Sequence, residues 1–122
     1  MPYTYNWEAQ GLYRKFTGIV SSDEILLSNF ETHKDPHFKN IKYVLNDFIE
    51  VVGHSIEAHH TQVYAKTDEI ISNTKNQLII ALVVTQDPLT ALAHSYREHM
   101  IGKRFECEVF QTIDDARKWV SI

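Results

Sequence analysis

The stretch that decides the fold is Leu78-Ile79-Ile80-Ala81-Leu82-Val83-Val84, the longest uninterrupted apolar run in the sequence. It is too short to cross a bilayer, which takes about 20 apolar residues. A strand that is apolar on both faces must be covered on both faces, as a central strand of a parallel sheet is. Asp87-Pro88 follows closely and is typical of a helix start, with Asp at the N-cap and Pro as the first helical residue. The run therefore predicts a buried central strand that leads into a helix.

The rest of the chain repeats this alternation of strand and helix. Strands are indicated by apolar–polar alternation, and helices by capping residues and a period near 3.6. These signals predict strands at 3–8, 12–20, 41–48, 77–85 and 105–109, and helices at 21–35, 55–72, 87–102 and 112–120, with 73–76 ending the second helix. The fold class is therefore α/β: one mixed, mostly parallel five-stranded sheet with four main helices on its two faces, in the order β-β-α-β-α-β-α-β-α, and with the first strand antiparallel. Residues 1–122 form a single domain.

The apolar residues of the helices are expected to face the core, since an amphipathic helix buries its apolar stripe. In the first helix these residues are Ile25, Leu26, Leu27 and Phe30. In the second helix they are Ile56, His60, Val63, Thr67, Ile70 and Ile71. In the third helix they are Leu89, Leu92, Ala93, Tyr96 and Met100.

Composition limits the kind of protein more than it identifies one. The 122 residues are 43% hydrophobic and 23% charged, which is typical of one folded, soluble domain. The net charge of -4 argues against a general nucleic-acid or anionic-membrane binder, because both need a basic surface. No membrane-spanning segment is expected. The N-terminal segment lacks the basic and apolar regions of a secretory signal, so a cytoplasmic location is expected.

Five segments of the chain resemble a known family. They are GLYRKFTG (11–18), SDEI (22–25), DPHF (35–38), YVLNDF (43–48) and FQTIDDARKW (110–119). With them the chain resembles the SpoIIAA-like family of small bacterial proteins, which is related in fold to STAS domains and to CRAL-TRIO lipid-binding folds. The resemblance implies a compact domain without enzymatic activity. The Asp-Ser-Ser-Gly-like motif that carries a phosphorylatable serine in anti-sigma-factor antagonists is absent. Ser55 stands only at a loosely comparable helix start, which leaves its phosphorylation open.

Polar residues cluster where two predicted strands end. They are Asn46, Asp47, His54, Ser55, Thr85, Gln86 and Asp87. In open α/β sheets, ligands bind outside the carboxyl ends of the strands. These residues therefore form a candidate rim for a ligand or partner. The alternative is structural: Ser55 and Asp87 would cap helices, and Asp47 would bond to a neighbouring loop.

Aromatic residues concentrate in the predicted N-terminal hairpin: Tyr3, Tyr5, Trp7, Tyr13 and Phe16. They form either a partner interface, where exposed aromatic residues are enriched, or the cover of one sheet face. The seven histidines do not follow metal-ligand spacing, and no metal or other cofactor is expected. Cys107 is the only cysteine, and the alternation around it points it inward as a structural thiol.

Three functions are compatible with this sequence. The first is a non-enzymatic regulatory or protein-interaction module, with self-association as a homodimer. The second is a protein that binds a small apolar ligand or lipid. The third is an enzyme that uses Asp47, His54 and Asp87 in acid–base roles, which requires that the three side chains converge on one cleft.

Overall fold

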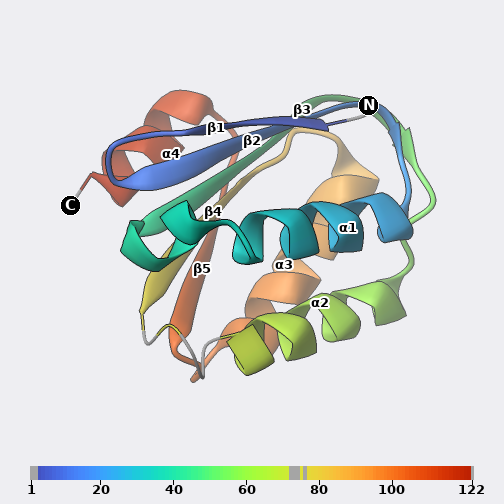
Figure 1. The fold of residues 1–122 in the computed structure, drawn as a ribbon. Helices are drawn as coiled ribbons and strands as arrows, with labels where there is room; N and C mark the ends of the chain where they lie inside the picture. The colour runs from blue at the N-terminus through green and yellow to red at the C-terminus, as the bar shows by residue number, and fades with distance from the viewer. Residues whose placement is uncertain (1–2, 72–74, 76, 122) are drawn as a thin grey trace.

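One five-stranded sheet organises the part of the chain that the computed structural model describes, residues 3–71, 75 and 77–121 (Figure 1). The strands are β1 (Tyr3–Trp7), β2 (Gly11–Val20), β3 (Tyr43–His54), β4 (Leu78–Val83) and β5 (Phe105–Phe110). They lie in the order β1-β2-β3-β4-β5. β1 is antiparallel to β2, and the other pairs are parallel. This confirms the predicted α/β class and the antiparallel first strand.

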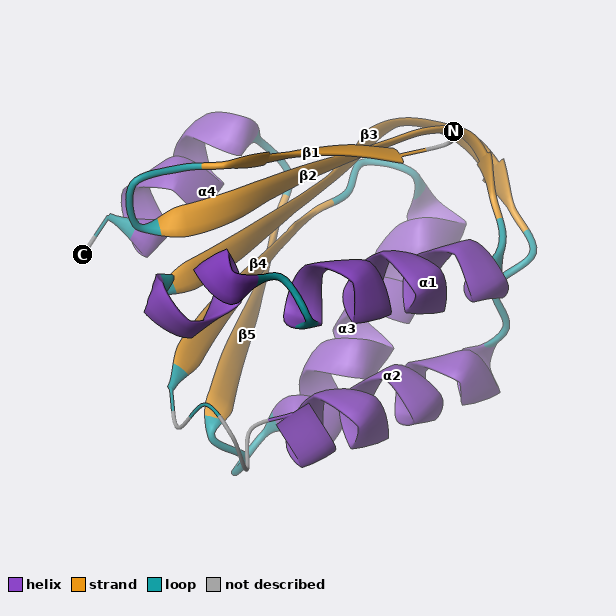
Figure 2. Cartoon of the chain, viewed as in Figure 1, coloured by secondary structure: helices purple, strands orange, loops and turns teal. Residues whose placement is uncertain are grey.

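The helices are α1 (Ser22–His33), α2 (Ala58–Ile71), α3 (Asp87–Met100) and α4 (Ile113–Val120), with a short 3-10 helix, η1 (Pro36–Asn40). Figure 2 shows α1, α2 and α3 on one side of the sheet and α4 on the other. From β2 to β5 the strand order advances in one direction, so crossovers of one hand place the three connecting helices on the same face. In the described part of the chain, no helix has the length and apolar character that a membrane span requires.

The strand β4 supplies apolar side chains to both faces, as its sequence predicts. Leu78, Ile80 and Leu82 pack into the core under α1–α3. Ala81 and Val83 pack under α4, in a second cluster with Ala116 and Val120. The prediction of a strand inside the sheet that is buried on both faces is therefore confirmed, although the middle of the five positions belongs to β3. β4 is an interior strand, flanked by β3 and the edge strand β5.

Several predicted boundaries hold and others move. Ser21 forms a capping box with Glu24, and the Thr112 side chain caps α4. α3 has Gln86 at its N-cap and Asp87 as its first residue, so the predicted Asp87 cap is wrong. α2 begins at Ala58, which removes the predicted cap at Ser55. β3 runs on to His54, six residues beyond the predicted end of this strand at residue 48. Of the predicted helix end at 73–76, only Lys75 lies within the described residues.

The helices α1 and α2 bury several polar residues that the prediction did not place in the core, although Ile25 is buried as predicted. α1 buries Ser28, Asn29 and Thr32, while Leu27 and Phe30 are 50% and 54% exposed. α2 buries a polar or small set: Thr61, Tyr64, Ala65 and Asp68. Its predicted core residues Val63 and Ile70 are 44% and 61% exposed. Because buried polar groups need partners, these helices indicate a polar site between them and the sheet.

Candidate functional site

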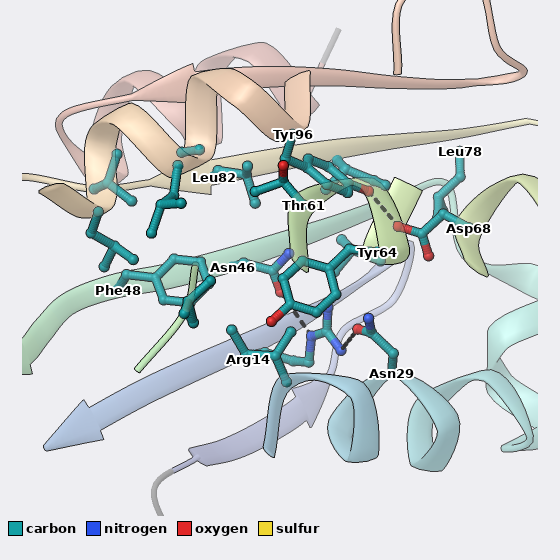
Figure 3. A pocket seen from close by; sticks show the side chains of 18 of the residues that line it. Arg14, Asn29, Asn46, Phe48, Thr61, Tyr64, Asp68, Leu78, Leu82 and Tyr96 are labelled. Carbon is teal, nitrogen blue, oxygen red and sulfur yellow. Dashed lines mark hydrogen bonds between the residues drawn. The ribbon is translucent and has the colours of Figure 1, made fainter. Parts of the chain in front are cut away.

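A cavity lies between the sheet and helices α1, α2 and α3 (Figure 3). The centre of a water molecule can move through about 90 Å³ of it. One water needs only about 10–15 Å³ by the same measure, so the cavity has room for a small organic molecule. Its apolar lining comes from β3, β4 and α3: Val44, Phe48, Ile80, Leu82, Leu89, Leu92 and Ala93. A concave apolar wall with a few polar groups is typical of a small-molecule site.

Arg14 is the cation of this cavity. It lies on β2 between Leu12 and Phe16, in the phase that faces α1–α3, and is only 7% exposed. Its Nε donates to Asn46 Oδ1 over 2.7 Å. Its Nη1 donates to Asn29 Oδ1 over 2.6 Å and to Ser28 Oγ over 3.2 Å. All three acceptors are neutral. Burial lowers the pKa of Arg14 to about 10, so the side chain stays charged at neutral pH.

Asp68 is the acid of the cavity and comes from α2. The Tyr96 hydroxyl donates to its Oδ2, and His33 Nε2 lies 3.9 Å from its Oδ1. Burial raises the pKa of Asp68 to about 6, against the hydrogen bond from Tyr96 and the charge of Arg14. Burial and then the charge of Arg14 lower the pKa of His33 to about 4. His33 is thus neutral at pH 7, and its buried Nδ1 has no hydrogen-bond partner among the described residues.

Phe48 and the acid Asp68 lie at opposite sides of the cavity, and Leu78 lies beside Asp68 (Figure 3). Figure 3 also shows Arg14 and Asn46 between these two sides. The Phe48 ring is held in place by stacking on Phe16, with ring centroids 4.7 Å apart. The arrangement therefore suits an amphipathic molecule, with its polar group near Arg14 and its apolar part near Phe48.

The candidate rim is not assembled as predicted. Asn46 lines the cavity, but Asp47 lies on the opposite face, where it accepts a hydrogen bond from Tyr13. Neighbouring residues of a strand point to opposite faces, so Asn46 and Asp47 cannot share a site. His54 Nδ1 accepts from the Ile56 N–H over 3.1 Å, and Gln86 Nε2 donates to the Val51 carbonyl over 2.6 Å. The remaining rim residues are exposed: Ser55, Thr85 and Asp87.

Two features of the sheet explain why the rim does not form. β3 continues to His54 beyond its last pairing with β4, which is Asp47 with Val83. The carboxyl ends of the two strands therefore do not lie side by side. In addition, the strand order does not reverse, so the sheet has no switch point at which a ligand crevice would open. The cavity lies under the helices α1, α2 and α3 instead.

Sequence reasoning missed Arg14, His33, Asp68 and Tyr96 as site residues. The signal for Arg14 was its position in the strand. It lies two residues from Leu12 and two from Phe16, so its side chain is on the same buried face as theirs. Asp68 falls in the same helical phase as Thr61, Tyr64 and Ala65. A charged residue in a buried phase is a candidate for function, because isolated buried charges are costly.

The hairpin aromatics cover the sheet. Tyr3 and Phe16 are 4% and 1% exposed and belong to the core, so the prediction that they form an interface is wrong. Tyr5 and Trp7 pack against the same core, and Trp7 also stacks on His37. Tyr13 lies on the α4 face, with Arg117 over its ring. The alternative that the aromatic residues cover one sheet face therefore holds for four of the five side chains, while Tyr13 covers the other face.

The described residues hold no cluster of metal-ligand side chains, and the thiol of Cys107 is buried. Within the described ranges, no three His, Cys, Asp or Glu side chains converge as metal ligands. Cys107 is buried, as its alternation predicts, and burial raises the pKa of its thiol. A thiol with a raised pKa is a poor nucleophile, which fits a structural role.

Comparisons with known proteins show the fold. No family model matches the chain, and no curated protein sequence is significantly similar to it. Among solved structures, it is similar to an uncharacterised protein of the DUF3478 family from Shewanella loihica PV-4, whose crystal structure has a SpoIIAA-like fold. The two share 16% sequence identity with a TM-score of 0.54, over 97% of this chain and 93% of the other. The arrangement of strands and helices described above is therefore a SpoIIAA-like fold.

Proposed function

We propose that this protein is a non-enzymatic binding module that holds a small, largely apolar molecule between the sheet and α1–α3. The observation that carries this proposal is the cavity itself, whose walls are mostly apolar while polar groups from β2, β3, α1, α2 and α3 converge on it. Close-packed protein interiors rarely leave such a space without a use.

The other two functions have less support. The enzyme hypothesis required Asp47, His54 and Asp87 to converge. Instead Asp47 bonds to Tyr13, His54 bonds to the backbone of Ile56, and Asp87 is exposed in the first turn of α3. Self-association was expected from the aromatic hairpin, but Tyr3 and Phe16 lie in the core. A regulatory role is compatible with ligand binding, since a bound molecule can control what the domain contacts.

Filling the cavity should prevent binding. Ala93 lines the cavity from α3, and Ala93→Leu adds three carbon atoms there. We expect this variant to bind 1-hexanol at least about tenfold more weakly than the wild type, because the larger side chain occupies the space that the ligand needs. Each methylene of the ligand that is no longer buried costs about 0.8 kcal/mol of binding free energy. The affinity is measured by NMR titration, and native mass spectrometry of protein purified from cells would show a copurified molecule directly.

Ala91→Leu is the matched control for this experiment. Ala91 lies on the same helix but is exposed, so the same substitution leaves the cavity unchanged. Its affinity for 1-hexanol should equal that of the wild type. Equal affinities of the Ala93 and Ala91 variants, or no binding of 1-hexanol by the wild type, would contradict the proposal.

A further inference from the structure

The hydrogen-bond donors of the cavity point to one class of ligand. We infer that the bound molecule carries a carboxylate, which the Nη2 group of Arg14 holds, and a short apolar tail directed toward Phe48. This inference rests on the proposed function and adds the chemical identity of the ligand's polar group.

The free polar groups around Arg14 are donors. Within the described residues, Nη2 of Arg14 makes no hydrogen bond, although Nε and Nη1 make three. The guanidinium can only donate, so Asn46 and Asn29 must turn their Oδ1 atoms toward it. Their Nδ2 groups then point elsewhere, and in the described part of the chain neither donates to another residue. An ionised carboxylate, which only accepts, is complementary to these groups.

The charge of Arg14 leads to the same conclusion. A buried cation is costly unless it is paired, and the three acceptors around Arg14 are neutral. Asp68 also lines the cavity and its charge acts on Arg14 through space, but its hydrogen bond comes from Tyr96 and it makes no ion pair with Arg14. A ligand carboxylate would form the charge-assisted bond that Arg14 lacks. A dianionic phosphate fits less well, because its second charge would face Asp68 across the same cavity.

The apolar part of the ligand is set by the walls near Phe48. Leu82, Val84, Leu89 and Leu92 line the cavity together with that ring. The free space of about 90 Å³ suits a short acyl chain or a small aromatic acid better than a long fatty acid. Hexanoate is therefore a suitable probe, and 1-hexanol is its uncharged counterpart of the same length.

The test compares hexanoate and 1-hexanol as ligands of the wild type at neutral pH, by NMR or calorimetric titration. We expect hexanoate to bind at least about tenfold more tightly, in line with a charge-assisted hydrogen bond. In Arg14→Gln the ratio of the affinities for hexanoate and 1-hexanol should fall to about one. In Arg97→Gln, which removes an arginine that pairs with Glu108 outside this cavity, the preference should stay.

The outcomes separate this inference from the proposed function. Equal or weaker binding of hexanoate by the wild type, with 1-hexanol bound, would overturn the carboxylate inference and leave the apolar site in place. Binding of neither compound would overturn both. A preference for hexanoate that persists in Arg14→Gln would overturn the role of Arg14. If Arg14→Gln does not fold, the wild-type comparison and Arg14→Met decide the question.

Discussion

The Asp68→Asn variant is expected to gain roughly 3 kcal/mol of stability relative to the wild type as the pH is raised from about 4 to about 7. The pKa of Asp68 is about 6 in the folded protein against an ordinary value of 3.8, because burial penalises the charged form. Below the ordinary value, the carboxyl is protonated in both the folded and the unfolded state. Between the two values, the unfolded state releases the proton more readily, so the wild type loses stability as the pH rises. Above about pH 6 the loss is complete.

His33 produces the opposite slope. Its pKa is about 4 in the folded protein against 6.5 ordinarily, so the unfolded state binds more protons between these values. The wild type therefore gains stability from His33 as the pH rises through this window, by roughly 3 kcal/mol. The contributions of Asp68 and His33 largely cancel between about pH 4 and pH 6. In the single variants Asp68→Asn and His33→Asn, the free energy of unfolding should therefore change with pH more steeply than in the wild type.

Urea unfolding at a series of pH values measures both effects as free energies of unfolding. His94→Asn is the matched control, because His94 is exposed on α3 and does not line the cavity. Its curve should run parallel to that of the wild type. A parallel curve for Asp68→Asn as well would show that Asp68 is not the buried, proton-binding group that the cavity geometry makes it.

The second large effect is expected at Gly11. Gly11→Ala should lower the free energy of unfolding by about 1–3 kcal/mol, the usual cost of inserting a carbon into a packed site. Gly11 pairs with Tyr43 across β2 and β3, and an added Cβ would lie 2.2 Å from Cε1 and Cζ of the Tyr43 ring. The ring cannot move freely, because its hydroxyl donates to Glu8.

Glu8 in turn binds Arg117 of α4 through two hydrogen bonds of 2.6 and 2.8 Å. Displacing Tyr43 therefore disturbs the cluster that joins the N-terminal hairpin to α4. Gly53→Ala is the control: Gly53 also lies in a strand, but the nearest atom to its added Cβ is 3.7 Å away on Ile19. Both variants reduce the freedom of the unfolded chain equally, so the difference between them reports the clash with Tyr43. Equal urea midpoints would contradict this interpretation.

The sequence by itself determined the order and type of the elements. The apolar run 78–84, the capping box at Ser21 and the Thr112 cap are local signals, because each depends on residues within one or two turns of one another. The alternation of strands and helices also predicted a mostly parallel sheet, and the family resemblance at 11–18 and 43–48 implied the same fold. Its fold expectation agrees with the SpoIIAA-like neighbour among solved structures.

Only the tertiary structure decided where the site lies. An apolar stripe in the sequence shows that a helix has an apolar and a polar face. It does not show which of the two faces the protein interior, because that depends on the residues of the sheet beneath the helix. In α1 and α2 that interior holds Arg14, so the polar faces turn inward and Phe30 and Ile70 turn outward. Arg14, Asn29 and Asp68 come from β2, α1 and α2, and chain order alone does not bring them together. The predicted rim does not form for the same reason. β3 continues beyond its last pair with β4, and the length of this extension depends on pairing between strands, which no local sequence pattern predicts.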